Sequence, residues 1–250
     1  MLARILSLAF WAFMALSSLV LFPVAVVLWA VTAPFDGRLR ALHQFTCFWA
    51  SLYTWTNPLW RVRVVGREHI RPGATYVMIA NHQSFVDILV LFRLFTHYKW
   101  VSKAEMFRLP CIGWNMALNR YVKLRRGDAA SIAAMMRACE RHLEAGSSIM
   151  IFPEGTRSAD GRLKAFKHGA FTLAQAARVP MLPIVLEGTA NALPKHGFVL
   201  RGHHDIRIRV LDEIPRERIV GRSVEDVIAE VQALYARELG EERGERRAAS

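Results

Sequence analysis

A histidine and an aspartate stand five residues apart in the segment 81–87 (NHQSFVD), directly after the apolar run 76–80. On a continuous helix this spacing would turn the two side chains about 140° apart. They can meet only if His82 lies in a loop and Asp87 in the first turn of the following helix. The carboxylate would then hold one imidazole nitrogen and leave the other free to take a proton from a hydroxyl group. The pair predicts general-base chemistry where a strand turns into a helix.

The same segment also has a purely structural interpretation. Ser84-x-x-Asp87 is a capping-box pattern ahead of the apolar run 88–92, and a carboxylate there is favoured by the helix dipole. Asp87 would then only start the helix, and His82 would be an ordinary loop histidine. From these seven residues alone, both interpretations stay open.

A second polar loop, 152–158 (FPEGTRS), follows another apolar run at 148–152. Gly155 permits a close backbone approach or a positive φ, and Arg157 offers a planar fork of donors suited to a phosphate. Glu154 could orient that guanidinium or accept a hydrogen bond from a substrate hydroxyl. The alternative is a polar turn in which Glu154 and Arg157 form a surface ion pair.

Basic residues between these loops also follow strand-like segments. Lys103 comes after one of them, and Lys123-Leu124-Arg125-Arg126 lies at the end of the next. Either could bring positive charge to a phosphate pocket, or could simply be a solvated basic face.

Alternating strand-like and helix-like segments predict an α/β sheet, in which active sites gather at the carboxyl ends of strands. His82 falls at one such end. We expect strands at 62–65, 76–80, 100–102, 121–124, 148–152, 179–186 and 206–210, and helices at 85–95, 129–145, 170–177 and 224–235, with broken helical structure at 106–118.

The N-terminus carries 29 residues without a charge, from Ile5 to Ala33. As a helix this stretch would be about 43 Å long, against about 30 Å for the hydrocarbon core of a bilayer. It could span with tilt, or break at Pro23 and lie in one leaflet. A signal peptide is the alternative, but its apolar region is typically about 7–15 residues, so we expect a retained anchor.

A second segment, 39–60, is rich in aromatic residues, which favour the membrane interface; a buried core helix is the alternative. We therefore expect a two-helix membrane-docking element at 1–60, a catalytic domain at 61–240 and a disordered Glu/Arg-rich tail at 241–250.

The net charge of +12 favours anionic lipid headgroups and anionic substrates. No nucleic-acid-binding signature accompanies it. The three cysteines form neither a disulfide framework nor a metal pattern, which fits a reducing compartment. Five arginines follow the anchor and place the body of the protein on the cytoplasmic side: Arg38, Arg40, Arg61, Arg63 and Arg67.

NHQSFVD followed about 65 residues later by FPEGTRS resembles the glycerolipid acyltransferases, in particular the bacterial 1-acyl-sn-glycerol-3-phosphate acyltransferases. The segments 103–114 (KAEMFRLPCIGW) and 179–185 (VPMLPIV) are similar to two further blocks of that family. The resemblance covers about residues 60–215. It implies a mixed sheet flanked by helices, the glycerolipid acyltransferase fold, with docking helices at the N-terminus and a location at the inner (cytoplasmic) membrane.

The resemblance also implies a reaction and roles for the residues. A fatty acyl group would pass from acyl-CoA or acyl carrier protein to the sn-2 hydroxyl of lysophosphatidic acid, with no cofactor and no metal, forming phosphatidic acid for phospholipid biosynthesis. His82, held by Asp87, would be the general base. Six further residues would bind the substrates: Lys103, Arg125 and Arg157 the phosphate, Glu154 the glycerol, Gly155 the oxyanion, and Thr156 beside them.

One departure concerns the second motif, where the family has Phe-Ile-x-Arg and this chain has Tyr121–Arg126, with Leu124 in place of an acid ahead of Arg125. Other acceptors therefore stay open: another lysophospholipid, glycerol 3-phosphate or an aminolipid. A thioesterase is a further alternative, although the chain has no G-x-S-x-G nucleophile elbow. A lipid-binding protein without activity is the third class.

Overall fold

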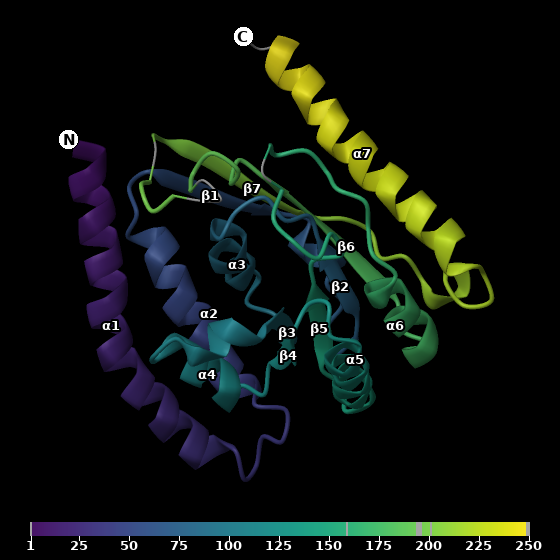
Figure 1. Ribbon diagram of the computed structural model, residues 1–250, viewed down its shortest axis with the longest axis horizontal. Coiled ribbons are helices and arrows are strands. Elements are labelled where there is room, and N and C mark those ends of the chain that lie inside the picture. The colour runs from purple at the N-terminus through teal and green to yellow at the C-terminus, as the bar shows by residue number, and fades with distance from the viewer. Residues whose placement is uncertain (1, 159, 194–196, 201, 249–250) are drawn as a thin grey trace.

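The computed structural model describes residues 2–158, 160–193, 197–200 and 202–248, with side chains described between 3 and 240. Within these ranges seven strands form one sheet in the order β1-β7-β6-β2-β5-β3-β4 (Figure 1). Neighbouring strands run parallel except β6 and β7, so the sheet is mixed, as predicted. The strands are β1 (Trp60–Val65), β2 (Val77–Ala80), β3 (Tyr98–Lys103), β4 (Val122–Leu124), β5 (Ser148–Ile151), β6 (Met181–Glu187) and β7 (His204–Val210).

Helices cover both faces of the sheet: α2, α3 and α4 lie on one side and α5, α6 and α7 on the other (Figure 1). The central strand β2 is buried on both faces, and its side chains alternate between two cores. Met78 packs with α2 and α3, whereas Ile79 packs with α5 and α6. The helices are α1 (Leu2–Thr32), α2 (Arg40–Trp55), α3 (Val86–Leu91), α4 (Ile112–Leu118), α5 (Ala129–Glu144), α6 (Gly169–Ala177) and α7 (Val224–Ala248).

The N-terminal helix α1 lies outside α2 and α4 (Figure 1). Among the described residues it is the one helix long and apolar enough to cross a membrane, and only 17% of its most apolar window is buried. By length and composition α1 is therefore a candidate membrane helix, and it continues through Pro23 without a break.

The second helix, α2, differs from the expected interfacial segment. Residues along one face are buried in the same core as the sheet, including Leu42, Cys47 and Trp49. Phe48 and Trp55 remain about half exposed. The core-helix alternative therefore describes most of α2, because its apolar residues recur at helical spacing and face the sheet.

At the other end of the chain, α7 continues to Ala248, past Gly240, where we expect a disordered tail at 241–250. Glu, Arg and Ala have high helix propensity, which allows the backbone to continue as a helix. Residues 249–250 lie outside the described residues.

Candidate active site

Four adjacent strands deliver the polar loops to one edge of the sheet. β2 is followed by the segment containing His82, β5 by the segment containing Arg157, β3 ends at Lys103, and β4 is followed by Arg126. Because β2, β5, β3 and β4 are neighbours and run parallel, their carboxyl ends meet at the same edge. Segments up to 75 residues apart in the chain thus form a single site.

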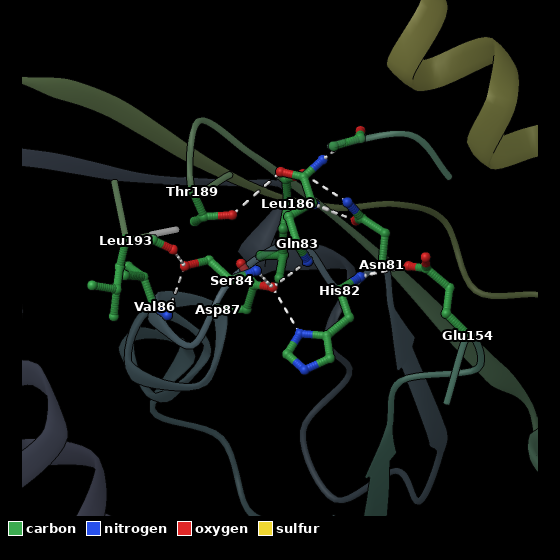
Figure 2. A network of polar contacts seen from close by, with 11 residues as sticks. Asn81, His82, Gln83, Ser84, Val86, Asp87, Glu154, Leu186, Thr189 and Leu193 are labelled. Atoms are coloured by element: carbon green, nitrogen blue, oxygen red, sulfur yellow. Dashed lines mark hydrogen bonds and ion pairs between the residues drawn. The ribbon is translucent and has the colours of Figure 1, made fainter. Parts of the chain in front are cut away.

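His82 and Asp87 make the contact that their spacing predicts. Nδ1 of His82 lies 2.8 Å from Oδ2 of Asp87, with the histidine in the loop and the aspartate in the first turn of α3 (Figure 2). The aspartate side chain is fully buried. An ionised carboxylate can only accept, so Nδ1 carries the proton and Nε2 is left as the basic nitrogen.

Asp87 also organises the loop, so the structural interpretation of the motif holds at the same time. Its Oδ2 atom accepts hydrogen bonds from the backbone N–H groups of Gln83, at 2.6 Å, and Ser84, at 2.8 Å. Ser84 in turn donates its hydroxyl to the carbonyl of Leu193 at 2.9 Å. The carboxylate that holds the imidazole therefore also holds the turn that carries it.

The His82 ring is fixed on a second side by stacking. Its centroid lies 3.8 Å from that of Phe152, with an interplanar angle of 9°. In Figure 2 the ring edge opposite Asp87, which carries Nε2, points away from the network. No residue within the described ranges hydrogen-bonds Nε2, and His82 lines the cavity next to it.

This cavity has a volume of about 420 Å³ and two distinct ends. Six polar side chains line it at the carboxyl edge of the sheet: His82, Ser102, Lys103, Arg126, Thr156 and Arg157. From there it passes between the sheet and α1–α4, along apolar side chains that include Trp49, Leu89, Phe92, Ile112 and Met116. A cation-rich mouth with an apolar interior suits an amphiphile that carries an anionic group.

The structure gives Glu154 a different position from the predicted contact with a substrate. This buried carboxylate does not line the cavity; Oε1 accepts from the backbone N–H of His82 at 2.6 Å and Oε2 from that of Lys164 at 3.1 Å. Burial raises its pKa to about 7. Glu154 therefore ties the His82 loop to the segment that follows the second motif.

Of the remaining predicted residues, some line the cavity and others belong to the surrounding loops. Thr156 and Arg157 line the cavity, as does Lys103, which also pairs with Glu105 at 3.3 Å. Gly155 has a φ of +69° and lies outside the lining. A positive φ is a conformation that favours glycine, so Gly155 allows the backbone to form this turn.

Arg125 and Arg126 are both exposed, but only Arg126 lines the cavity. Arg125 directly follows β4, and Arg126 begins the turn after it. The resemblance assigns phosphate binding to Arg125, but the structure places this residue outside the cavity.

Two residues at this site, Arg126 and Asn81, are not among those predicted from the sequence. Arg126 stood in the basic run without being singled out. Asn81 exchanges two hydrogen bonds with the backbone of Leu186 on β6, at 2.9 and 2.7 Å, and so fixes the start of the loop. The available signal was an amide side chain between the apolar run 76–80 and His82. Among the described residues, no group of three or more His, Cys, Asp and Glu side chains is placed to hold a metal ion.

Comparison with known proteins agrees with this geometry. The family model described as Acyltransferase matches residues 61–187, which includes both motif loops. The chain belongs to the acyltransferase family. The predicted resemblance and the α/β fold are thereby confirmed.

Two curated relatives with similar sequences are both named 1-acyl-sn-glycerol-3-phosphate acyltransferase. The chain is 39% identical over 176 residues to the chloroplast 1-acyl-sn-glycerol-3-phosphate acyltransferase BAT2 of Brassica napus, covering 70% of this chain and 51% of that protein. It is 38% identical over 152 residues to the 1-acyl-sn-glycerol-3-phosphate acyltransferase of Saccharomyces cerevisiae, covering 59% and 50%. The chain thus spans about half the length of these curated relatives.

A solved structure shares the fold over nearly the whole chain. The 1-acyl-sn-glycerophosphate (LPA) acyltransferase PlsC from Thermotoga maritima superposes with a TM-score of 0.76 and covers 96% of both chains, at 19% identity. At that identity the likeness shows the fold alone.

Proposed function

We propose that this acyltransferase moves a fatty acyl group from an acyl thioester, on coenzyme A or acyl carrier protein, to the sn-2 hydroxyl of 1-acyl-sn-glycerol 3-phosphate. The product is phosphatidic acid, and the thioester is a co-substrate, so the reaction needs no cofactor. The observation that carries the proposal is a single cavity in which Nε2 of His82 lies among cationic side chains at the mouth of an apolar interior. The names of the relatives support the same substrate.

The residues supply each step of this chemistry. Nε2 of His82 takes the proton of the acceptor hydroxyl, while Asp87 stabilises the imidazolium that forms. The oxygen attacks the thioester carbonyl, and the carbon–sulfur bond then breaks. The proton on Nε2 passes to the departing thiolate, which leaves as a thiol. Holding both substrates in one cavity makes the attack effectively intramolecular, and no acyl-enzyme is needed.

The charged side chains at the mouth position the acceptor. Lys103, Arg126 and Arg157 face the same cavity as His82, and a phosphate attracts such donors, Arg157 and Arg126 through bidentate contacts. Arg125 is adjacent to Arg126 in the chain but does not line the cavity. We therefore assign the phosphate to the three cavity residues, with Arg126 taking the role first expected for Arg125.

We propose further that α1 lies in one leaflet of the membrane, with the catalytic body on the cytoplasmic side of the inner membrane. Polar contacts along the inner face of α1 support this. Ser7 accepts the backbone N–H of Leu200 at 2.9 Å, and Ser18 lies 3.2 Å from the hydroxyl of Tyr53. If α1 crossed the bilayer, Tyr53 of α2 and Leu200 of the catalytic domain would enter the hydrocarbon core with it, where unpaired polar groups are costly.

The test is acyl transfer from a long-chain acyl-CoA to lysophosphatidic acid in detergent micelles, for the wild type and for His82→Ala. His168→Ala is a matched control, since this exposed histidine directly before α6 pairs with Glu225 in the first turn of α7 and does not line the cavity. We expect phosphatidic acid from the wild type and the control, and a loss of about 10²–10⁴-fold in His82→Ala.

Three other outcomes would contradict parts of the proposal. Transfer that survives in a folded His82→Ala variant removes this residue as the base. Thioester cleavage without a lipid product favours a thioesterase. If glycerol 3-phosphate, an aminolipid or another lysophospholipid outcompetes lysophosphatidic acid, the acceptor is wrong and the chemistry is retained.

A further inference from the structure

A second group of cationic side chains lies at the edge of the sheet opposite His82. Arg38 donates to the carbonyl of Gly146 at 3.1 Å, just before β5, and Arg120 lies two residues before β4. These strands begin at this edge and end at the edge that carries the catalytic loops. Since strands rise about 3.3 Å per residue, the six residues of β3 place the two edges roughly 15–20 Å apart. The group is therefore separate from the cavity, which neither arginine lines.

Hydrogen bonds hold two segments together at this edge. Nζ of the buried Lys99 donates to the carbonyl of Arg38, in the loop after α1, at 2.7 Å and to that of Asn119, after α4, at 2.9 Å. Arg120 in turn donates through Nη1 to the carbonyl of Gly37 at 3.4 Å. The loop after α1 and the turn before β4 are thus held side by side, so their arginines are presented together.

Four arginines at this edge form what we call the amino-edge cluster: Arg38, Arg40, Arg120 and Arg141. All are exposed except Arg38, which is half-buried. Within the described residues none of the four forms an ion pair with a carboxylate. The acid of the same loop, Asp36, instead caps α2, where its Oδ2 atom accepts the backbone N–H of Ala41 at 2.8 Å. The positive charge of the cluster is therefore open to an external anion.

Two histidines beside the cluster are affected by this charge. Burial, together with nearby cations that include the four arginines, lowers the pKa of His97 to about 3 and that of His142 to about 4. Both histidines are therefore neutral at physiological pH. A site in which several cations act on the same neighbours has a positive potential that attracts anions.

The same edge continues the apolar surface of α1. Val27 and Val31, near the end of the helix, are each 64% exposed, and Phe35 just beyond it is 92% exposed. Figure 1 shows the loop after this end of α1 returning directly into α2. An apolar face that ends in cations is typical of an interfacial helix, whose apolar side chains enter the acyl region while its cations lie among the headgroups.

We propose that the amino-edge cluster binds the headgroup phosphate of an anionic phospholipid in the leaflet that holds α1. This rests on the proposed placement of α1 in one leaflet and not on the reaction at His82. The planar guanidinium groups of Arg40 and Arg120 match the oxygens of a phosphate, and Phe35 lies where the acyl region of the same leaflet begins. The bound lipid is a component of the surrounding membrane, distinct from the acceptor in the cavity.

A matched pair of double variants tests this site. Arg40→Gln with Arg120→Gln removes two exposed guanidinium groups of the cluster. Each cation at an anionic surface strengthens binding about fivefold, so the preference for anionic lipid should fall by roughly 25-fold. Arg137→Gln with Arg178→Gln is the control, because it removes two exposed arginines from α5 and the end of α6, on the face of the sheet away from α1 and α2.

The experiment measures how the full chain distributes between two vesicle populations that are mixed and then separated by density. One contains phosphatidylcholine alone, and the other also contains phosphatidylglycerol. We expect the wild type and the control to favour the anionic vesicles equally, and the cluster variant to lose most of that preference. Inorganic phosphate, added at constant ionic strength, should leave the distribution unchanged. Acyl transfer in uncharged detergent micelles should also be unchanged in the cluster variant, because its substitutions lie at the edge opposite His82.

The loss of preference in the cluster variant alone supports the proposal. An equal loss in both double variants would show that binding follows net charge, and would overturn the site. An unchanged preference in the folded cluster variant also overturns it, as does a preference that inorganic phosphate abolishes, since the ligand would then be free phosphate. Thermal melting of each variant establishes that it is folded.

Failure of the proposed function has a different result. A wild type that prefers anionic vesicles yet transfers no acyl group contradicts the proposed reaction and leaves this inference standing. A wild type that associates with neither vesicle population overturns both this inference and the placement of α1 in a leaflet.

Discussion

Oδ2 of Asp87 lies 2.8 Å from Nδ1 of His82, and the same oxygen accepts the backbone N–H groups of Gln83 and Ser84. One buried carboxylate oxygen therefore holds both the imidazole and the turn that presents it. The negative charge on this oxygen would stabilise the imidazolium formed when His82 takes a proton. Geometry and charge can be separated by substitution at this position.

Asp87→Asn should keep the geometry and remove the charge. The amide oxygen can take the place of Oδ2 and accept the same bonds, but it cannot stabilise the imidazolium as a carboxylate does. We expect kcat for acyl transfer to fall by about 10²–10⁴-fold, with a small change in KM for lysophosphatidic acid. Steady-state kinetics check this. An unchanged kcat in the folded variant would show that Asp87 serves only to begin helix α3.

Glu154→Gln should lower kcat without a matching rise in KM. The carboxylate accepts one N–H bond on each oxygen, whereas the amide of glutamine would turn a donor toward either His82 or Lys164. Leaving one buried N–H group unpaired costs about 1–3 kcal/mol, which corresponds to roughly 10–100-fold if it displaces His82. A rise in KM with kcat unchanged would instead indicate that Glu154 contacts the substrate.

Much of the fold was predictable because its signals are local. The buried run of β2 and the helical stripe of α5 stand out in the sequence, and the observed ends differ from the expected ones by one residue. The contact between His82 and Asp87 was predictable for the same reason, since both residues lie within one short turn. Even the gathering of the motifs follows from the rule that sites form at the carboxyl ends of strands.

The remaining features depend on contacts between distant segments. Nothing within β2 or β5 specifies that they are neighbours, so the side-by-side order that joins His82 to Arg157 emerges only in the folded sheet. The sequence suggested Glu154 as a substrate ligand because it does not reveal the two backbone N–H groups that this carboxylate accepts. Those groups lie 72 and 10 residues away in the chain. The burial of α2 likewise depends on a sheet whose arrangement its own sequence does not encode.

Adjacent arginines after β4 offer a matched pair of substitutions. Arg126 lines the cavity and the adjacent Arg125 does not, so Arg126→Ala should raise KM for lysophosphatidic acid by about 10–100-fold, the usual worth of a charge-assisted hydrogen bond. Arg125→Ala should change KM by less than about threefold, as for a solvated charge. Kinetics with the acceptor varied check both. The reverse ranking would restore the role first expected for Arg125.

Lys99 should make stability depend on pH in a defined direction. This lysine on β3 is 1% exposed, and its Nζ donates to the carbonyls of Arg38 and Asn119 at 2.7 and 2.9 Å. Burial, together with the charge of Arg120, lowers its pKa from 10.5 to about 7. Between those two values the unfolded chain keeps the proton that the folded protein has lost, so stability rises with pH across this range.

Lys99→Met removes that titration, so the test compares the stability of the wild type with that of this variant. From pH 7 to pH 9 we expect the free energy of unfolding of the wild type to rise by about 2 kcal/mol relative to Lys99→Met, measured by urea unfolding in mild detergent. Lys123→Met, at an exposed lysine on the neighbouring strand β4, controls for loss of a positive charge. Because the two carbonyls lose a donor at every pH, Lys99→Met also carries a constant penalty. A difference between the two proteins that stays the same at pH 7 and pH 9 would show that Lys99 keeps its proton in the folded state.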